Sequence, residues 1–109
     1  MVEVAARREG ANFSISAEGH SGFADAGSDI VCAAVSTLME ALVVGLEDVL
    51  EIDADAAYDP SIPRMDVEWN DSEGRALDIA KTIWLSIKGV EEAHPNEVKV
   101  IGDFSGEEE

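Results

Sequence analysis

Two short stretches at the beginning of the chain alternate apolar and polar residues, which is the period of a β-strand with one buried face. Their apolar positions are Val2, Val4 and Ala6, and then Phe13, Ile15 and Ala17. Residues 9–12 lie between the two stretches, contain a glycine and are few enough for a hairpin turn. The pattern predicts a β-hairpin, followed by a glycine-rich loop over residues 19–28 that shows no periodicity.

Helical spacing follows this loop. Apolar residues three or four positions apart predict a helix over residues 29–51, at Val31, Val35, Leu38, Leu42, Leu46 and Val49. Asp29 is of a residue type that commonly caps a helix N-terminus, so we expect the helix to begin there. A second stripe predicts another helix, at Ala76, Ala80, Ile83, Ile87 and Val90. It follows a cap-rich entry at residues 70–72 and stops before Pro95, because proline disfavours helix in the preceding residue.

Three further strands are predicted, at residues 54–58, 64–69 and 98–101, the first two joined by a turn with two prolines. The predicted element order is therefore ββαββαβ. Five short strands with two amphipathic helices favour an α+β fold. We expect a two-layer sandwich in which a mostly antiparallel sheet carries both helices on one face.

The 109 residues (11.6 kDa) suffice for one domain, which we place at residues 1–104, with an acidic disordered tail at residues 105–109. The N-terminal residues lack the pattern of a secretory signal. With a mean hydropathy of −0.02, no apolar run is expected to cross a membrane. One cysteine cannot form an internal disulfide, which fits a reducing cytoplasm.

The charge is strongly acidic, since seven basic residues stand against 24 acidic ones and the formal net charge is −17. This field repels nucleic-acid phosphates and anionic lipid, so neither nucleic acid nor a membrane is an expected partner. It attracts cationic partners, although solubility alone also accounts for it. No metal or other cofactor is expected, because Asp53, Asp55 and Asp59 lack the glycine and terminal glutamate of a calcium loop.

Cys32 has two interpretations. A free cysteine is commonly a small buried hydrophobe. In the predicted helix, however, Cys32 falls in the first turn, where free backbone N–H groups and the positive end of the helix dipole favour a thiolate. It also lies at the border of the apolar stripe, with Ser36 one turn further along the same face. A nucleophile at that position would be able to meet a substrate.

His20 lies just past the second predicted strand, between Gly19 and Gly22. An imidazole within hydrogen-bond reach of the Cys32 sulfur would form the thiolate–imidazolium pair needed for nucleophilic attack, and would later protonate the leaving amine. A loop histidine is also commonly a solvated surface residue. The other histidine, His94, is expected to be capping or solvated at the end of the second helix.

Two neighbouring stretches of the chain carry a distinctive motif. They are Gly19-His20-Ser21 and Ala26-Gly27-Ser28-Asp29-Ile30-Val31-Cys32-Ala33-Ala34-Val35-Ser36. Together they resemble the motif of the ribosomal-processing cysteine protease family. That motif is a glycine–histidine pair and then G-x-D-x-x-C-A-x-x-S. The predicted element order and the length also fit the family. Ser21 is one departure, because the family usually has alanine there.

The resemblance implies a small bacterial cytoplasmic homodimer with a cysteine–histidine dyad, here His20 and Cys32. It implies removal of a short N-terminal extension from a large-subunit ribosomal protein precursor, with cleavage after bulky aromatic residues. By match of position, supporting roles fall to Gly19, Gly27, Asp29 and Ser36.

The residues themselves leave some of these roles open. Asp29 is expected either to cap the helix, leaving N–H groups free near Cys32 as an oxyanion site, or to orient the imidazole of His20. Gly22 and Phe23 lie in a loop that is expected either to close over Cys32 as a flap or to remain an ordinary surface loop. At the level of function, the sequence supports a cysteine endopeptidase, with a non-enzymatic acidic module that binds a basic ribosomal protein as the alternative.

Overall fold

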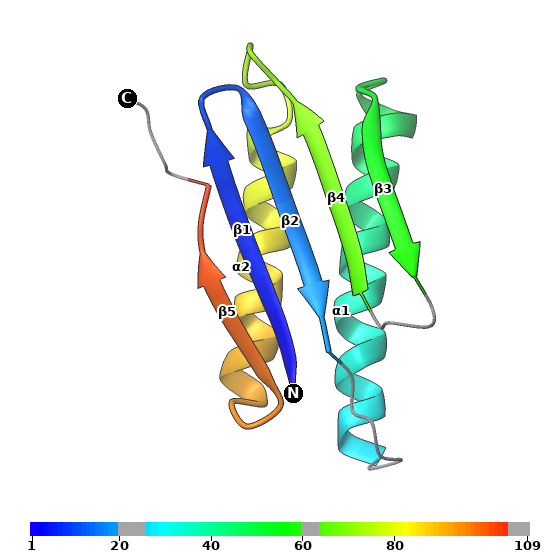
Figure 1. Cartoon of the computed structure of the whole chain (residues 1–109), viewed down its shortest axis with the longest axis vertical. Helices are drawn as coiled ribbons and strands as arrows, with labels where there is room; N and C mark the ends of the chain where they lie inside the picture. The colour runs from blue at the N-terminus through cyan, green and yellow to red at the C-terminus, as the bar shows by residue number, and fades with distance from the viewer. Residues whose placement is uncertain (20–25, 60–63, 105–109) are drawn as a thin grey trace.

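A computed structural model describes residues 1–19, 26–59 and 64–104 of the chain, and the backbone alone at residues 26–29 and 59 (Figure 1). Its elements are β1 (Val2–Glu9), β2 (Asn12–Glu18), α1 (Ala26–Val44), a π-helical segment (Gly45–Val49), β3 (Ala54–Asp59), β4 (Arg64–Asn70), α2 (Leu77–Ala93) and β5 (Val98–Gly102). The predicted order ββαββαβ is confirmed. The predicted acidic tail and most of the predicted flap lie outside the described residues.

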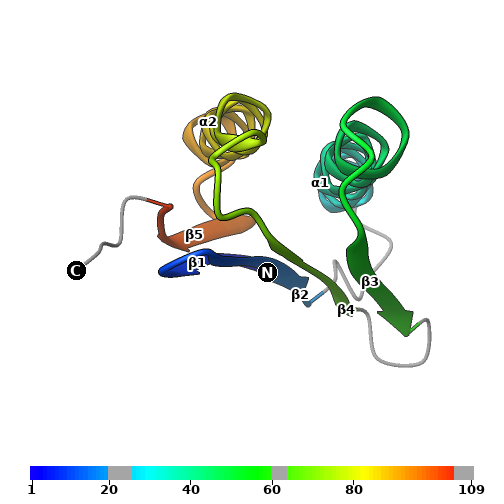
Figure 2. The ribbon, with the colours of Figure 1, turned by 90° about the horizontal axis from the view of Figure 1, so that it is seen from above.

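The strands form one five-stranded sheet in the order β3-β4-β2-β1-β5. The three pairings among β1, β2, β4 and β3 are antiparallel, and only β5 pairs in parallel, with β1. Both helices lie on the same face of this sheet, and the described residues leave the other face uncovered (Figure 2). The fold is therefore the predicted α+β two-layer sandwich with a mostly antiparallel sheet.

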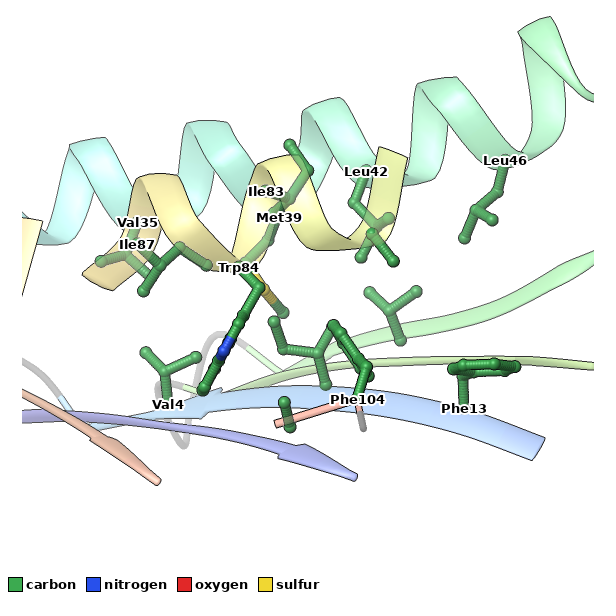
Figure 3. Packing of buried hydrophobic residues seen from close by; sticks show 14 of the residues in the cluster. Val4, Phe13, Val35, Met39, Leu42, Leu46, Ile83, Trp84, Ile87 and Phe104 are labelled. Carbon is green, nitrogen blue, oxygen red and sulfur yellow. The ribbon is translucent and has the colours of Figure 1, made fainter. Parts of the chain in front are cut away.

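The core lies between the sheet and the two helices (Figure 3). Alternate residues of the strands point into it, as the period-2 pattern predicts. The helices contribute most of the stripes predicted from their spacing, but Val49, predicted in the first stripe, is 67% exposed. At one end the core is aromatic: Phe13 stacks on Trp69 with ring centroids 5.4 Å apart, and Phe104 lies 6.0 Å from Trp84. Both tryptophans are buried core residues, and Phe104 is a core residue that the sequence pattern did not indicate.

The first helix differs from its prediction at both ends. It begins at Ala26, three residues earlier than expected, so Asp29 lies within the first turn and is not the N-cap. The α-helix ends at Val44 and continues as the π-helical segment. Gly45 begins that segment where the two helices approach closely: a Cβ there would lie 3.1 Å from Cγ2 of Ile79.

The second helix begins later than predicted, at Leu77, because Asn70 still belongs to β4. The buried Asp71 carboxylate organises the entry instead. Its two oxygens accept hydrogen bonds from the backbone N–H groups of Arg75 and Ala76, each at 2.8 Å. At the other end His94 is the C-cap, as expected for a capping residue, and its backbone N–H donates to the carbonyls of Val90 and Glu91.

One helical stretch, Ile30–Val49, is long and apolar enough to cross a membrane by length and composition, with a hydropathy of 1.9. Length and composition alone therefore do not exclude a membrane span, contrary to the expectation from the sequence. Its inner side supplies buried residues to the core, namely Val31, Val35, Met39, Leu42 and Leu46. Core helices of compact domains pass the same test, because they too are rich in apolar residues.

Candidate active site

Cys32 lies at the border between the buried and exposed sides of α1. Val31 and Val35 are buried, Ala33 and Ser36 are exposed, and Cys32 itself is half-buried and free of any disulfide. This confirms the position at the edge of the apolar stripe that the helical spacing predicts. A sulfur there is accessible from one side and backed by the core on the other.

The cysteine opens into a pocket of about 280 Å³ between α1 and the inner face of the sheet. Helix α1 contributes one wall, and the ends of β1, β2, β3 and β4 contribute the other; the lining residues are Val2, Ala17, Gly19, Cys32, Val35, Ser36, Met39, Tyr58, Arg64 and Met65. Most of these side chains are apolar. The pocket is therefore suited to an apolar side chain of a ligand beside the sulfur.

Gly19 forms part of this wall directly after β2. Its φ is +105°, in the region that favours glycine, and a Cβ at this position would collide with the backbone carbonyl oxygen of Met1. The chain therefore needs glycine here to pass the first residues of the protein at the edge of the pocket. His20 is the next residue in the sequence.

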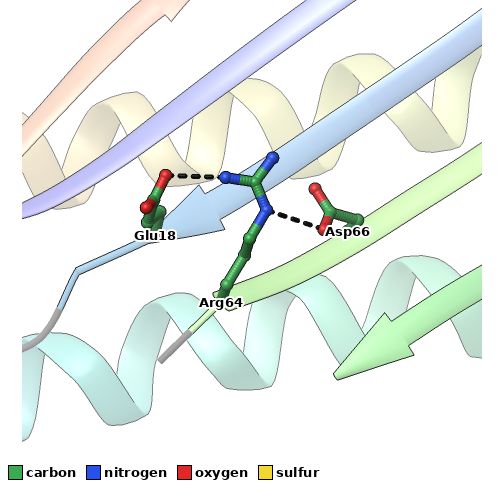
Figure 4. Close-up of polar contacts among 3 residues, drawn as sticks. All are labelled: Glu18, Arg64 and Asp66. Atoms are coloured by element: carbon green, nitrogen blue, oxygen red, sulfur yellow. Dashed lines mark hydrogen bonds and ion pairs between the residues drawn. The ribbon is translucent and has the colours of Figure 1, made fainter. Parts of the chain in front are cut away.

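An ion-pair network stabilises the same end of β2 (Figure 4). Arg64 is one of the residues that line the pocket, and its guanidinium donates hydrogen bonds to Glu18 Oε1 at 2.7 Å and to Asp66 Oδ2 at 2.8 Å. The hydrogen bond to Asp66, and secondarily the charges of the two carboxylates, raise the pKa of Arg64, so it stays charged at any ordinary pH. Because Glu18 and Arg64 are directly paired across β2 and β4, the network joins two strands at the rim of the pocket.

The structure brings Gly19, Cys32 and Ser36 together around one pocket. Gly27 and Asp29 lie in the first turn of α1, where the backbone alone is described. Three predicted site residues, His20, Gly22 and Phe23, lie outside the described residues. The role of Asp29 as orienter of His20 therefore stays a prediction, whereas its role as N-cap is wrong.

The earlier start of α1 also corrects the electrostatic argument for Cys32. Only the first four N–H groups of a helix lack intrahelical partners, and Cys32 is the seventh residue of a helix that begins at Ala26. The helix dipole likewise acts mainly within the first turn. The prediction that Cys32 sits among free N–H groups of the first turn is wrong, so activation of its sulfur has to come from another group.

Several pocket residues were not predicted from the sequence. Met39 follows Cys32 by seven positions, which places it two turns along the same side of α1, and helical spacing would have found it. Tyr58, Arg64 and Met65 come from β3 and β4, and only the pairing of these strands brings them to the cysteine. In the described part of the chain, no three His, Cys, Asp or Glu residues are grouped so as to hold a metal ion.

A protein-family model identifies the class of protein to which the chain belongs. The model of a cysteine protease family, described as cysteine protease Prp, matches residues 1–99. The chain therefore belongs to the Prp family of cysteine proteases. No curated protein matches the chain.

Solved structures share the fold. The essential ribosomal processing protease Prp from S. aureus, in complex with a substrate peptide, has a TM-score of 0.83 at 20% identity, over 94% of this chain and 100% of that one. The same protease with a covalently linked product peptide has a TM-score of 0.80 at 21% identity, with the same coverage. SMU.848 from Streptococcus mutans has a TM-score of 0.73 at 26% identity, over 94% of this chain and 96% of that one. Both crystal structures of the S. aureus protease thus contain a peptide.

Proposed function

We propose that this cysteine protease removes a short N-terminal extension from a large-subunit ribosomal protein precursor, with Cys32 as nucleophile and His20 as general base and acid. The observation that carries the proposal is the pocket in which Cys32 and Gly19 are neighbours, since Gly19 directly precedes His20. The S. aureus protein of the same fold is a ribosomal processing protease seen with a substrate peptide, which supports the substrate class.

The proposed reaction has two steps. Sγ of Cys32, as a thiolate beside the His20 imidazolium, attacks the carbonyl carbon of the scissile peptide bond, and His20 gives its proton to the leaving amine, so that a thioester to Cys32 forms. Water then attacks the thioester while His20 takes up one of its protons. The carbon–sulfur bond breaks, the new carboxylate leaves, and the thiolate–imidazolium pair is restored. The apolar wall formed by Val35, Met39 and Met65 would receive the apolar residue before the cut.

The test is cleavage of a ribosomal protein precursor that carries an N-terminal extension, followed by mass spectrometry of the new N-terminus. Cys32→Ala should abolish cleavage and preserve the fold, because the side chain is only half-buried. Ser86→Ala, an exposed position of α2, is the matched control and should cleave at the wild-type rate. Full cleavage by Cys32→Ala would end the proposal. Tight binding of the precursor without cleavage by the wild type would favour the non-enzymatic acidic module.

The proposal includes a homodimer formed through the outer side of α1. Its exposed positions are spaced three or four apart and carry no charge, namely Ile30, Ala33, Thr37, Ala41 and Val44. Ile30 and Val44 are 64% and 50% exposed, and such a continuous apolar strip commonly marks an interaction surface. A second copy is the proposed occupant because a self-complementary strip of small and apolar residues suits helix packing about a twofold axis.

We also propose that the enzyme works in the cytoplasm of a bacterium. A thiol nucleophile has to remain reduced, and the cytoplasm keeps exposed and half-buried thiols reduced. The S. mutans and S. aureus proteins of this fold come from bacteria. Fractionation of cells that produce the tagged protein would test the compartment.

A further inference from the structure

A second hollow, larger than the cysteine pocket, lies away from Cys32. It measures about 570 Å³, and the strand residues that cross it point to the face of the sheet opposite the helices. A row of directly paired residues crosses it from strand to strand: Arg7 on β1, Ser14 on β2, Glu68 on β4 and Asp55 on β3. It shares no lining residue with the cysteine pocket.

The charge of this hollow is unbalanced. Four carboxylates line it, those of Glu9, Asp53, Asp55 and Glu68, against the single guanidinium of Arg7. Among the described residues none of these five side chains forms an ion pair, whereas Glu18 and Asp66 on the same face are both bound to Arg64. The surface around Arg64 is thus internally neutralised, and the hollow keeps its excess negative charge for a cation from outside.

The hollow and the cysteine pocket lie on opposite faces of the sheet, and the edge strand β3 contributes residues to both. β3 has a neighbour on one side only, and it lines the hollow with residues 53–55 and the cysteine pocket with Tyr58. From Asp55 to Tyr58 the strand advances about 10 Å, at roughly 3.3 Å per residue. A polypeptide that passes around this free edge can therefore contact both sites, one on each face of the sheet.

We propose that the hollow on the open sheet face binds a lysine- or arginine-rich stretch of the polypeptide that Cys32 cleaves. The proposed protease function supplies the identity of this ligand; the geometry and the charge of the hollow stand independently of it. The site would hold the basic stretch by paired carboxylates on neighbouring strands, while the apolar pocket beside Cys32 selects the residue at the cut. Recognition would thus be divided between a charged site and an apolar one.

The experiment measures binding of a fluorescein-labelled octalysine peptide by anisotropy at low salt. The double variant Asp55→Asn/Glu68→Gln should weaken binding about tenfold, because two nearby charges are lost. Its matched control, Asp78→Asn/Glu92→Gln, removes the same charge from the exposed side of α2 and should change the dissociation constant less than twofold. Arg7→Gln should tighten binding, and Lys88→Gln on α2 should not.

Equal changes in the hollow variants and the α2 variants would overturn the proposal, since they would mean that only the general field attracts the peptide. Absence of octalysine binding to the wild type would overturn it as well. As a second measurement on the unaltered protein, amide NMR shifts during the titration should concentrate at residues 7–14, 53–55 and 68. Failure of the protease function would appear differently, as octalysine binding at the hollow without any cleavage by Cys32.

Discussion

The two helices cover the same face of the sheet, yet their sequences serve different purposes. On the exposed side α2 carries Asp78, Lys81, Lys88 and Glu92, as expected of a helix whose outer side meets water. Between residues 30 and 44, α1 has a single charged residue, Glu40, and its outer positions are apolar or small. Packing on the sheet and a mostly charged outer side explain α2 except for Leu85, which is 64% exposed, but they explain only half of α1.

We propose that the remainder of α1 serves catalysis and assembly. The cysteine lies where its buried side meets its exposed side, and the outer strip is proposed to hold a second copy. A helix that packs on the sheet, carries the cysteine at its edge and is proposed to bind a second copy cannot show the simple pattern of α2, with one apolar side and one charged side. This explains why Ile30–Val49 resembles a membrane span in composition while five of its residues form the core.

The inner sides of the two helices should respond alike to truncation. Leu42 in α1 and Ile87 in α2 are both fully buried. Leu42→Ala and Ile87→Ala should each lower the free energy of unfolding by about 2–5 kcal/mol, through lost burial and the cavity left behind. Urea unfolding followed by circular dichroism measures both. A loss below about 1 kcal/mol for Leu42→Ala alone would show that α1 does not pack as described.

Alanine should be harmful at Gly19, which leads from β2 toward α1, and tolerated at Gly10, in the turn between β1 and β2. Both glycines have positive φ, so alanine strains the backbone at either position by roughly 1 kcal/mol. Only at Gly19 does the added Cβ meet another part of the chain, the carbonyl of Met1, whereas at Gly10 it meets nothing within 4 Å. Gly19→Ala should therefore reduce kcat/KM for a cleaved peptide at least tenfold, and Gly10→Ala should leave it within twofold. Equal activity of the two variants would contradict the account of this wall.

The outer sides should differ in assembly, with the smallest effect on stability. Ile30→Glu/Val44→Glu should convert a dimer into a monomer in light scattering, while changing the unfolding free energy of the subunit little, because both side chains are exposed in the subunit. Leu85→Glu is the matched control: Leu85 is 64% exposed on α2 and belongs to a charged surface. A wild type that is monomeric, or a dimer that survives the α1 variant and is lost with Leu85→Glu, would overturn the assignment of the interface.

The strands, the order of the elements along the chain and the two-layer architecture could be predicted, because alternation and helical spacing report directly on burial. The starts of the two helices could not. Ala26 to Ser28 lack the pattern of a helix start, and Asp29 imitates a cap while lying in the first turn. Likewise residues 70–72 suggested a helix start, but Asn70 pairs in β4 and Asp71 binds two N–H groups further along the chain.

The cysteine and its helix neighbour Ser36 could be found from spacing within one helix. The opposite wall could not, because Tyr58, Arg64 and Met65 reach Cys32 only through the pairing of β3, β4 and β2. Phe104 shows the same limit in the core. It follows the last strand without any periodic signal, and its burial depends on the aromatic cluster that three distant elements assemble.

The most direct test of the central claim is the rate at which iodoacetamide alkylates Cys32 at neutral pH in three proteins: wild type, His20→Ala and His94→Ala. These are the only two histidines, and His94 is a C-cap residue whose Nδ1 lies 3.3 Å from Glu97 Oε1. If the His20 imidazolium stabilises the Cys32 thiolate, His20→Ala should slow alkylation by roughly tenfold or more, and His94→Ala should leave the rate unchanged. Equal rates in all three proteins would contradict the dyad.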